Sequence, residues 1–207
     1  HIAHNLLSIV PDTKRQVITL WLDFDCNYIV KAHYWKSEII MNTAKLTYES
    51  FKQKKPNEYR ILSKITKTTE PHDIIAWTMI TYNILFAQDY LQEKGILRSK
   101  QEDKSAEYVM KDSTKQQTHS EMGKIYTHAT SPIRRFVDIY NQMIYHNEEF
   151  ISVDIDTINE RVSTISKFHK QHAILELSHK TRSKPVLVNI YSKNKETVVV
   201  EYKKQCF

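Results

Sequence analysis

Glycine and cysteine are scarce in this sequence of 207 residues, which contains only two of each. Cys26 and Cys206 stand far apart and in no paired spacing, which argues against a disulfide framework and against a cysteine zinc site. The cysteine usage therefore favours a reducing, intracellular setting, either cytoplasmic or nuclear. No apolar run reaches the roughly 20 residues that a membrane helix needs, so the sequence predicts no membrane partner.

Apolar residues, in contrast, are plentiful and basic residues are in excess. Hydrophobic residues make up 41% of the sequence, which is enough for a buried core and argues against a disordered chain. Lys and Arg number 30 against 24 Asp and Glu. This surplus of positive charge favours a polyanionic partner, although scattered basic residues on a solvated surface also explain it.

Hydrophobic periodicity predicts both strands and helices, and hence an α+β fold. Near alternation on both sides of Asp25-Cys26-Asn27 predicts a β-hairpin over residues 16–36. Two β-branched stretches within residues 184–204 predict a second strand pair. Residues 99–118 carry few apolar groups, which predicts a mobile loop with at most one helical turn around Tyr108.

Two long segments, residues 72–94 and 155–178, have apolar residues at helical spacing. In the first segment Asp73 is the expected N-cap and Gly95 the expected stop, and apolar residues on several faces predict a mostly buried helix. The second segment is expected to bury one apolar stripe, made of Ile158, Val162, Ile165 and Phe168.

The stretch IYTHATSPIRRFVDIYNQ, residues 125–142, combines a predicted helix start with two adjacent arginines. Pro132 suits the first helical position and Thr130 or Ser131 can cap it, so we expect a helix to begin there. Its unpaired N–H groups and its dipole would favour a phosphate at that end.

Arg134 and Arg135 would point about 100° apart on such a helix, so they cannot both face one atom. We expect one to hold a phosphate in its planar fork and the other to pack against a carboxylate or a second phosphate. Asp138 lies within reach of either arginine. An exposed, ion-paired helix end without a ligand is the alternative interpretation of these residues.

The run YTHATSPIRRFVD closely resembles the signature of the ribonuclease II (RNB) family, the processive 3′–5′ exoribonucleases that include the catalytic subunit of the eukaryotic exosome. Other stretches follow in the order of the family: NLLSIVPDTKR, the hairpin with AKLTYES, MITYNILFA and GILR. The resemblance implies the C-terminal portion of an RNB catalytic domain over residues 1–180, with a mixed sheet packed by long helices. Residues 181–207 resemble the first strands of the OB-type RNA-binding barrel that follows in these enzymes.

The resemblance also implies roles for individual residues. Arg134 would contact the scissile phosphate and stabilise the charge that builds on it, supported by Arg135, Thr130 and Ser131. Tyr48, at the entry to an expected helix, would stack on the last nucleotides of the RNA. Three more residues are expected substrate contacts: Arg98, Tyr126 and His128. Ordinary packing of Tyr48, hydrogen-bonded structural roles for Tyr126 and His128, and an exposed helix-end charge at Arg98 are the alternatives.

Members of the family hydrolyse RNA with a divalent ion, which we expect to be Mg²⁺, held by clustered aspartates upstream of the first of these stretches. The sequence contains no such cluster, and His169 and His172 fit surface histidines better than a metal site. The metal ligands are therefore expected outside this chain.

The resulting hypothesis is that the chain is part of a 3′–5′ exoribonuclease that hydrolyses single-stranded RNA to nucleoside monophosphates. Such an enzyme is expected to work in a complex with other RNA-processing proteins. A catalytically inactive RNB-like RNA-binding module is the main alternative. A purely structural scaffold is a third.

Overall fold

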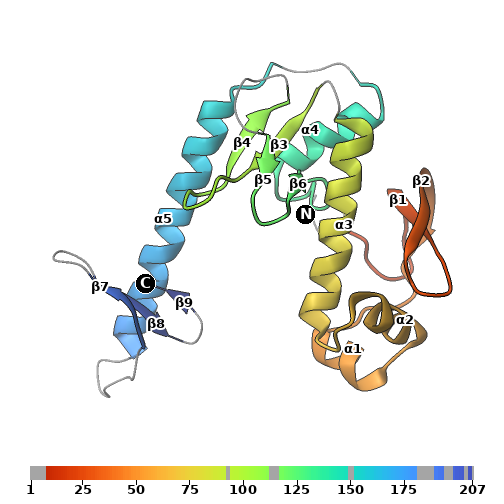
Figure 1. Ribbon diagram of the computed structural model, residues 1–207, viewed down its shortest axis with the longest axis horizontal. Helices are drawn as coiled ribbons and strands as arrows, with labels where there is room; N and C mark the ends of the chain where they lie inside the picture. Colours follow the sequence, from red (N-terminus) through yellow and green to blue (C-terminus); the bar gives the residue numbers. More distant parts are fainter. Residues whose placement is uncertain are drawn as a thin grey trace. The chain divides into compact units, whose positions relative to one another are not determined.

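The structure is a computed structural model that describes residues 8–91, 94–111, 117–148, 152–180, 189–193, 198–202 and 205–206. The chain forms two compact units, His1–Ser152 and Val153–Phe207. Figure 1 shows the order of their elements along the chain. None of the helices in these ranges is long and apolar enough to cross a membrane.

The first unit begins with the predicted hairpin, which is longer than expected. Strand β1 (Lys14–Phe24) pairs antiparallel with β2 (Val30–Met41). The turn is closed by the Asp25 side chain, whose Oδ1 accepts from the backbone N–H of Asn27 at 2.9 Å and of Ile29 at 2.8 Å. Asp25 thus satisfies two donors of the turn, as expected of a turn aspartate.

Three helices follow, α1 (Tyr48–Lys54), α2 (Asn57–Thr66) and α3 (Pro71–Tyr90). A capping box between Thr47 and Ser50 starts α1 directly before Tyr48. The sequence did not predict α2. The expected N-cap of α3 was wrong, because Pro71 occupies the first helical position and Glu70 precedes it as N-cap. Asp73 lies in the first turn instead.

Four short strands come next: β3 (Ile96–Ser99), β4 (Glu107–Met110), β5 (Thr118–His119) and β6 (Lys124–Ile125). β3 pairs with β4, and β5 with β6, in both cases antiparallel. The predicted helical turn at Tyr108 was therefore wrong, because Tyr108 lies in β4 and both it and Val109 are buried. Burial on both faces of β4 removes the alternation that marks a half-exposed strand. Residues 112–116 of the predicted loop lie outside the described residues.

Helix α4 (Phe136–Tyr145) starts later than predicted. Residues 132–134 form a turn in which the N–H groups of Arg134 and Arg135 both lie 3.2 Å from the carbonyl oxygen of Ser131. The N-cap is Arg135, in an extended conformation and without a side-chain cap bond. The two arginines thus precede the helix. The physical reason is Asp138, whose side chain binds the turn from inside the first turn of α4.

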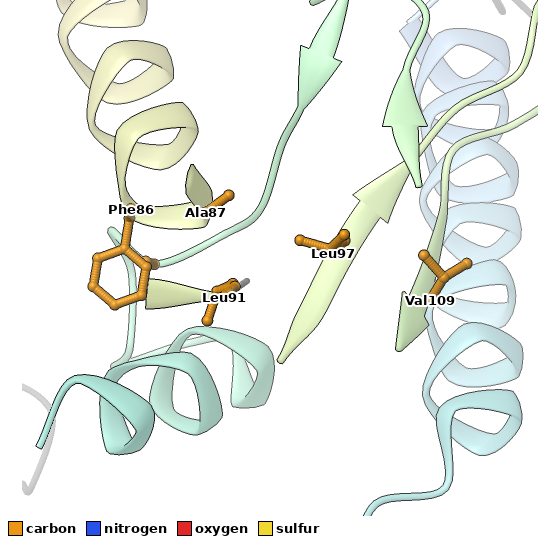
Figure 2. Close-up of a cluster of buried hydrophobic side chains, with 6 residues drawn as sticks. Phe86, Ala87, Leu91, Leu97 and Val109 are labelled. Atoms are coloured by element: carbon orange, nitrogen blue, oxygen red, sulfur yellow. The ribbon is translucent and has the colours of Figure 1, made fainter. Parts of the chain in front are cut away.

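One hydrophobic core joins α3, β3, β4 and the segment before α4. Figure 2 shows five of its members, Phe86, Ala87, Leu91, Leu97 and Val109. Gly95 connects α3 to β3 with φ +116°, and a Cβ atom there would lie 2.7 Å from Cδ2 of Leu91. Glycine is therefore needed for both backbone conformation and space. Gly95 lies beyond the end of α3 at Tyr90, so it is not the immediate helix stop that we expected.

The second unit contains the predicted long helix α5 (Ile155–Lys180) and the strands β7 (Asn189–Lys193), β8 (Val198–Tyr202) and β9 (Gln205–Cys206). β8 pairs antiparallel with β7 and β9, which confirms the predicted strand pair. The expected buried stripe on α5 is only partly present, because Ile165 and Phe168 are 55% and 61% exposed. The α+β class is confirmed, with small antiparallel sheets in place of one large sheet. The proposed domain boundary at residue 180 stays a prediction.

Candidate functional site

The site is built on residues 126–135, which we call the arginine loop. A buried amide side chain from α3 holds its first half. Asn83 Nδ2 donates to the Tyr126 hydroxyl at 3.1 Å, and Asn83 Oδ1 accepts from the Ala129 N–H at 3.0 Å. Asn83 is 2% exposed, so these bonds form away from water. Breaking one of them would leave a buried polar group without a partner.

Helix α4 supplies a second buried amide. Asn141 Oδ1 accepts from the Ile96 N–H at 3.0 Å, and its Nδ2 lies 2.8 Å from Thr127 Oγ1 and 3.0 Å from the carbonyl oxygen of Ile96. Gln142 Nε2 also donates to the Ala129 carbonyl at 2.7 Å. Side chains from α3 and α4 thus fix the arginine loop against β3.

The two arginines have different partners. Arg135 lies beside Asp138, whose side chain is 0% exposed: Arg135 Nη2 donates to Oδ1 at 2.9 Å, and Nε and Oδ2 form an ion pair at 2.8 Å. The same Oδ1 accepts from the Ser131 N–H at 2.6 Å. Arg134 is exposed, and within the described ranges it has no carboxylate at ion-pair distance; its side chain makes one hydrogen bond there, a 3.4 Å contact from Nη2 to Ser131 Oγ.

A groove with a volume of about 1060 Å³ runs along the exposed side of the arginine loop. Thr130, Ser131 and Arg134 line it, and so do residues 15–18 of β1. Neighbouring residues of α3 bind both of these segments, because the Tyr82 hydroxyl donates to the Ile18 carbonyl at 3.2 Å while Asn83 holds the loop. Much of the remaining lining is apolar, which suits a ligand with flat, weakly polar parts and a charged backbone.

A second group of charges lies around His128. Its Nδ1 is 2.7 Å from the Tyr108 hydroxyl, and its ring meets the Tyr108 and Tyr126 rings edge-on at centroid distances of 5.7 Å and 5.6 Å. The guanidinium of Arg98 lies over the Tyr108 ring, 4.5 Å from its centroid. Arg98 Nη1 is buried and has no hydrogen-bond partner among the described residues.

Burial is the main cause of a strongly lowered pKa at His128, about 3, followed by the positive charges of Arg135, Arg98 and Arg134. His128 is therefore neutral at physiological pH. Burial and the charge of Arg135 also lower the pKa of Arg98. The positive charges of three guanidinium groups thus act on a neutral imidazole, and this concentration of positive charge favours an anion.

The other predicted residues are more scattered. Tyr126 is buried and its hydroxyl contacts Asn83, whereas Thr130 and Ser131 lie in the groove wall. Tyr48 is 46% exposed, and one face of its ring stacks on His72 with 3.8 Å between centroids. His72 is eleven residues before Asn83 in α3, about 16 Å along the helix axis. The structure therefore does not bring Tyr48 to the arginine loop.

No three His, Cys, Asp or Glu side chains come close enough to hold a metal ion in the part of the chain that the structure describes. His169 and His172 both lie on the exposed surface of α5. These two histidines do not form a metal site, and the charged side chains of the arginine loop are its arginines.

Sequence reasoning missed three residues that organise the site, namely Tyr108, Asn83 and Asn141. These bonds join positions 14 to 46 residues apart in the sequence, so no local pattern reveals them. One signal was present, since Asn83 falls in the stretch MITYNILFA that was recognised for its resemblance.

Comparison with known proteins identifies the fold. No family model and no curated protein matches the chain. Mycoplasma genitalium RNase R, both in complex with ribose-methylated single-stranded RNA and in its apo form, matches 100% of this chain with a TM-score of 0.75 and 13% identity. Yeast Ssd1, a pseudonuclease, matches 75% of this chain with a TM-score of 0.59 and 13% identity.

The chain spans 51% of RNase R and 32% of Ssd1, about half and a third of their lengths. At this low identity the likeness concerns the fold, and nothing in it singles out the exosome type. The chain has the RNB-like fold of part of RNase R.

Proposed function

We propose that this chain is the phosphate-binding part of a metal-dependent 3′–5′ exoribonuclease that hydrolyses single-stranded RNA to nucleoside monophosphates. The observation that carries the proposal is the unequal pairing of the two arginines. Arg135 is neutralised by the buried Asp138, whereas Arg134 is exposed at the groove with its charge available. The RNB-like fold and the resemblance of the loop to the RNB signature support the same assignment.

In this proposal Arg134 binds the scissile phosphate in its planar fork and stabilises the charge that grows on it in the transition state. The pair Arg135–Asp138 fixes the turn from which Arg134 projects. Thr130 and Ser131 stand beside it in the groove wall, where their hydroxyl groups can donate to phosphate oxygens. The fixed loop supplies the preorganisation that such stabilisation requires.

The divalent ion that such hydrolysis needs would be held by aspartates outside these 207 residues. It would neutralise the phosphate and activate water. The residues of this chain would bind and orient the RNA.

RNA binding tests the first part of the proposal. We expect the chain to bind single-stranded RNA with an affinity that falls as salt rises. Arg134→Ala should weaken binding about tenfold or more, since hydrogen bonds to charged groups are the strong ones, and should reduce the slope of log K against log salt by about 0.7. Arg60→Ala is a matched control, because it removes one exposed arginine of α2, outside the groove. Equal effects of the two substitutions would refute the assignment of Arg134.

Catalysis tests the second part. The protein that includes the aspartate segment, incubated with magnesium and single-stranded RNA, should release nucleoside monophosphates from the 3′ end. Arg134→Ala should abolish most of this release. If the protein with its aspartates releases none, the exoribonuclease assignment is wrong.

A non-catalytic RNA-binding module is the second candidate. The match to Ssd1, itself a pseudonuclease, favours it. This alternative predicts the same salt-dependent binding and the same effect of Arg134→Ala on affinity, but no nucleotide release under any condition.

A further inference from the structure

Tyr108 on β4 contacts both Arg98 on β3 and His128 on the arginine loop. It is 4% exposed and stands directly opposite Arg98 in the β3–β4 pairing. Its ring lies under the Arg98 guanidinium, and its hydroxyl reaches Nδ1 of His128. The ring of Tyr108 thus contacts a cation while its hydroxyl contacts an imidazole.

The bond between Tyr108 and His128 has a preferred direction. A phenol hydroxyl is a stronger donor than acceptor, and an unprotonated imidazole nitrogen is a strong acceptor. Burial also raises the pKa of Tyr108, so the hydroxyl keeps its proton. The direction O–H to Nδ1 leaves the single proton of neutral His128 on Nε2.

The contact with Arg98 sets the orientation of a second group. A guanidinium over an aromatic face is attracted by the ring, and its planar group tends to stack on that face. Arg98 has no carboxylate partner at ion-pair distance among the described residues, so the Tyr108 ring is its main fixed neighbour. Losing the ring would free the guanidinium to move.

We propose that Tyr108 is a positioning residue of the candidate site, which holds His128 as the Nε2–H tautomer through its hydroxyl and orients Arg98 through its ring, so that both present N–H donors to an RNA phosphate. The role in RNA binding rests on the function proposed above. The positioning itself is a property of the free protein and can be measured without RNA.

Two substitutions separate the two contacts. Tyr108→Phe keeps the ring under Arg98 and removes the hydroxyl bond to His128. Tyr108→Leu removes both. Tyr34→Phe and Tyr34→Leu are matched controls, because Tyr34 is 49% exposed on β2 and is not among the described residues that line the groove.

The first measurement is ¹⁵N NMR of the histidine rings in the free chain, with His128 assigned by His128→Gln. We expect the wild type to show an unprotonated Nδ1 and a protonated Nε2, and Tyr108→Phe to show a mixture of tautomers. A protonated Nδ1 in the wild type, or an unchanged spectrum in Tyr108→Phe, would overturn the proposal.

The second measurement is binding to single-stranded RNA over a range of salt concentrations. Tyr108→Phe should weaken binding about fivefold, as expected for one hydrogen bond, with an unchanged salt slope. Tyr108→Leu should also lower the slope by about 0.7, because the Arg98 contact is lost. Wild-type binding by both folded variants would remove Tyr108 from the site.

The outcomes distinguish this proposal from the proposed function. If Arg134→Ala binds RNA like the wild type while Tyr108→Phe changes the His128 tautomer, the RNA function fails and the positioning of His128 stands. If Tyr108→Leu does not fold, the tautomer and the affinity of Tyr108→Phe still decide the hydroxyl contact.

Discussion

Arg134 and Arg135 are neighbours in sequence with opposite surroundings, and their substitution should separate stability from binding. Arg135→Ala would leave the fully buried carboxylate of Asp138 without its cation, which typically costs about 3–5 kcal/mol of unfolding free energy. Arg134→Ala removes an exposed side chain and should change it by less than about 0.5 kcal/mol. Urea unfolding of both variants measures the difference.

The matched control is the double variant Arg135→Ala/Asp138→Asn, which removes the buried charge together with its partner. It should recover part of the stability lost in Arg135→Ala, because an amide is cheaper to bury unpaired than a carboxylate. Equal stability of the Arg134 and Arg135 single variants would contradict the unequal pairing seen in the structure.

His128 should make the stability of the fold depend on pH in the acidic range. Its pKa is lowered from an ordinary 6.5 to about 3, mainly by burial and then by the charges of Arg135, Arg98 and Arg134. Between these pH values the unfolded chain binds a proton that the folded chain does not. Stability is therefore complete above pH 6.5 and is lost as the pH falls towards 3, by at most about 1.4 kcal/mol per pH unit.

Urea unfolding at a series of pH values tests this slope. His128→Gln should reduce the slope of the unfolding free energy against pH. Burial also lowers the pKa of His119, and the contribution of His119 to the slope should remain in both proteins. Identical slopes in the wild type and His128→Gln would show that His128 titrates normally.

At the scale of the elements, Asn141 joins α4 to β3 and to the arginine loop. Asn141→Ala would leave the N–H of Ile96 and the hydroxyl of Thr127 short of buried partners. We expect a loss of about 3 kcal/mol, from more than one unsatisfied group. Asn57→Ala, at an exposed position in α2, should cost little. Thermal unfolding of the two variants compares them, and a similar change in both would contradict the bridging role.

Elements with a clear period could be predicted from sequence, and those defined by long-range bonds could not. The hairpin, α3 and α5 follow from alternation or helical spacing. The predicted start of α4 was wrong because Asp138 binds the preceding turn. Strand β4 was missed because burial on both of its faces removes the alternation of apolar and polar residues.

In the candidate site, too, residues of a local motif could be predicted from sequence, and residues that act through long-range bonds could not. The arginines stand out in a short local motif, so the sequence could indicate them. Asn83 and Tyr108 act through bonds to residues 46 and 20 positions away, which only the folded chain brings together. The choice of Arg135, and not Arg134, as the partner of Asp138 also needed the observed turn.

At the scale of the whole molecule, every residue of the groove and of the arginine loop lies in the first unit, His1–Ser152. A chain ending at Ser152 should therefore keep the arginine loop and its response to Arg134→Ala in RNA binding. Circular dichroism would report whether the shortened chain folds. The slope of log K for RNA binding against log salt would report its phosphate contacts. Loss of the Arg134 effect in a shortened chain that still folds would show that the second unit completes the site.

The bonds made by Tyr82 and Asn83 bear on how far this groove can widen. These two consecutive residues of α3 bind Ile18 of β1 and Ala129 of the arginine loop, and both bonded segments contribute to the lining of the groove. A single helix thus tethers both segments. Moving β1 and the loop apart would require breaking one of these bonds or deforming α3.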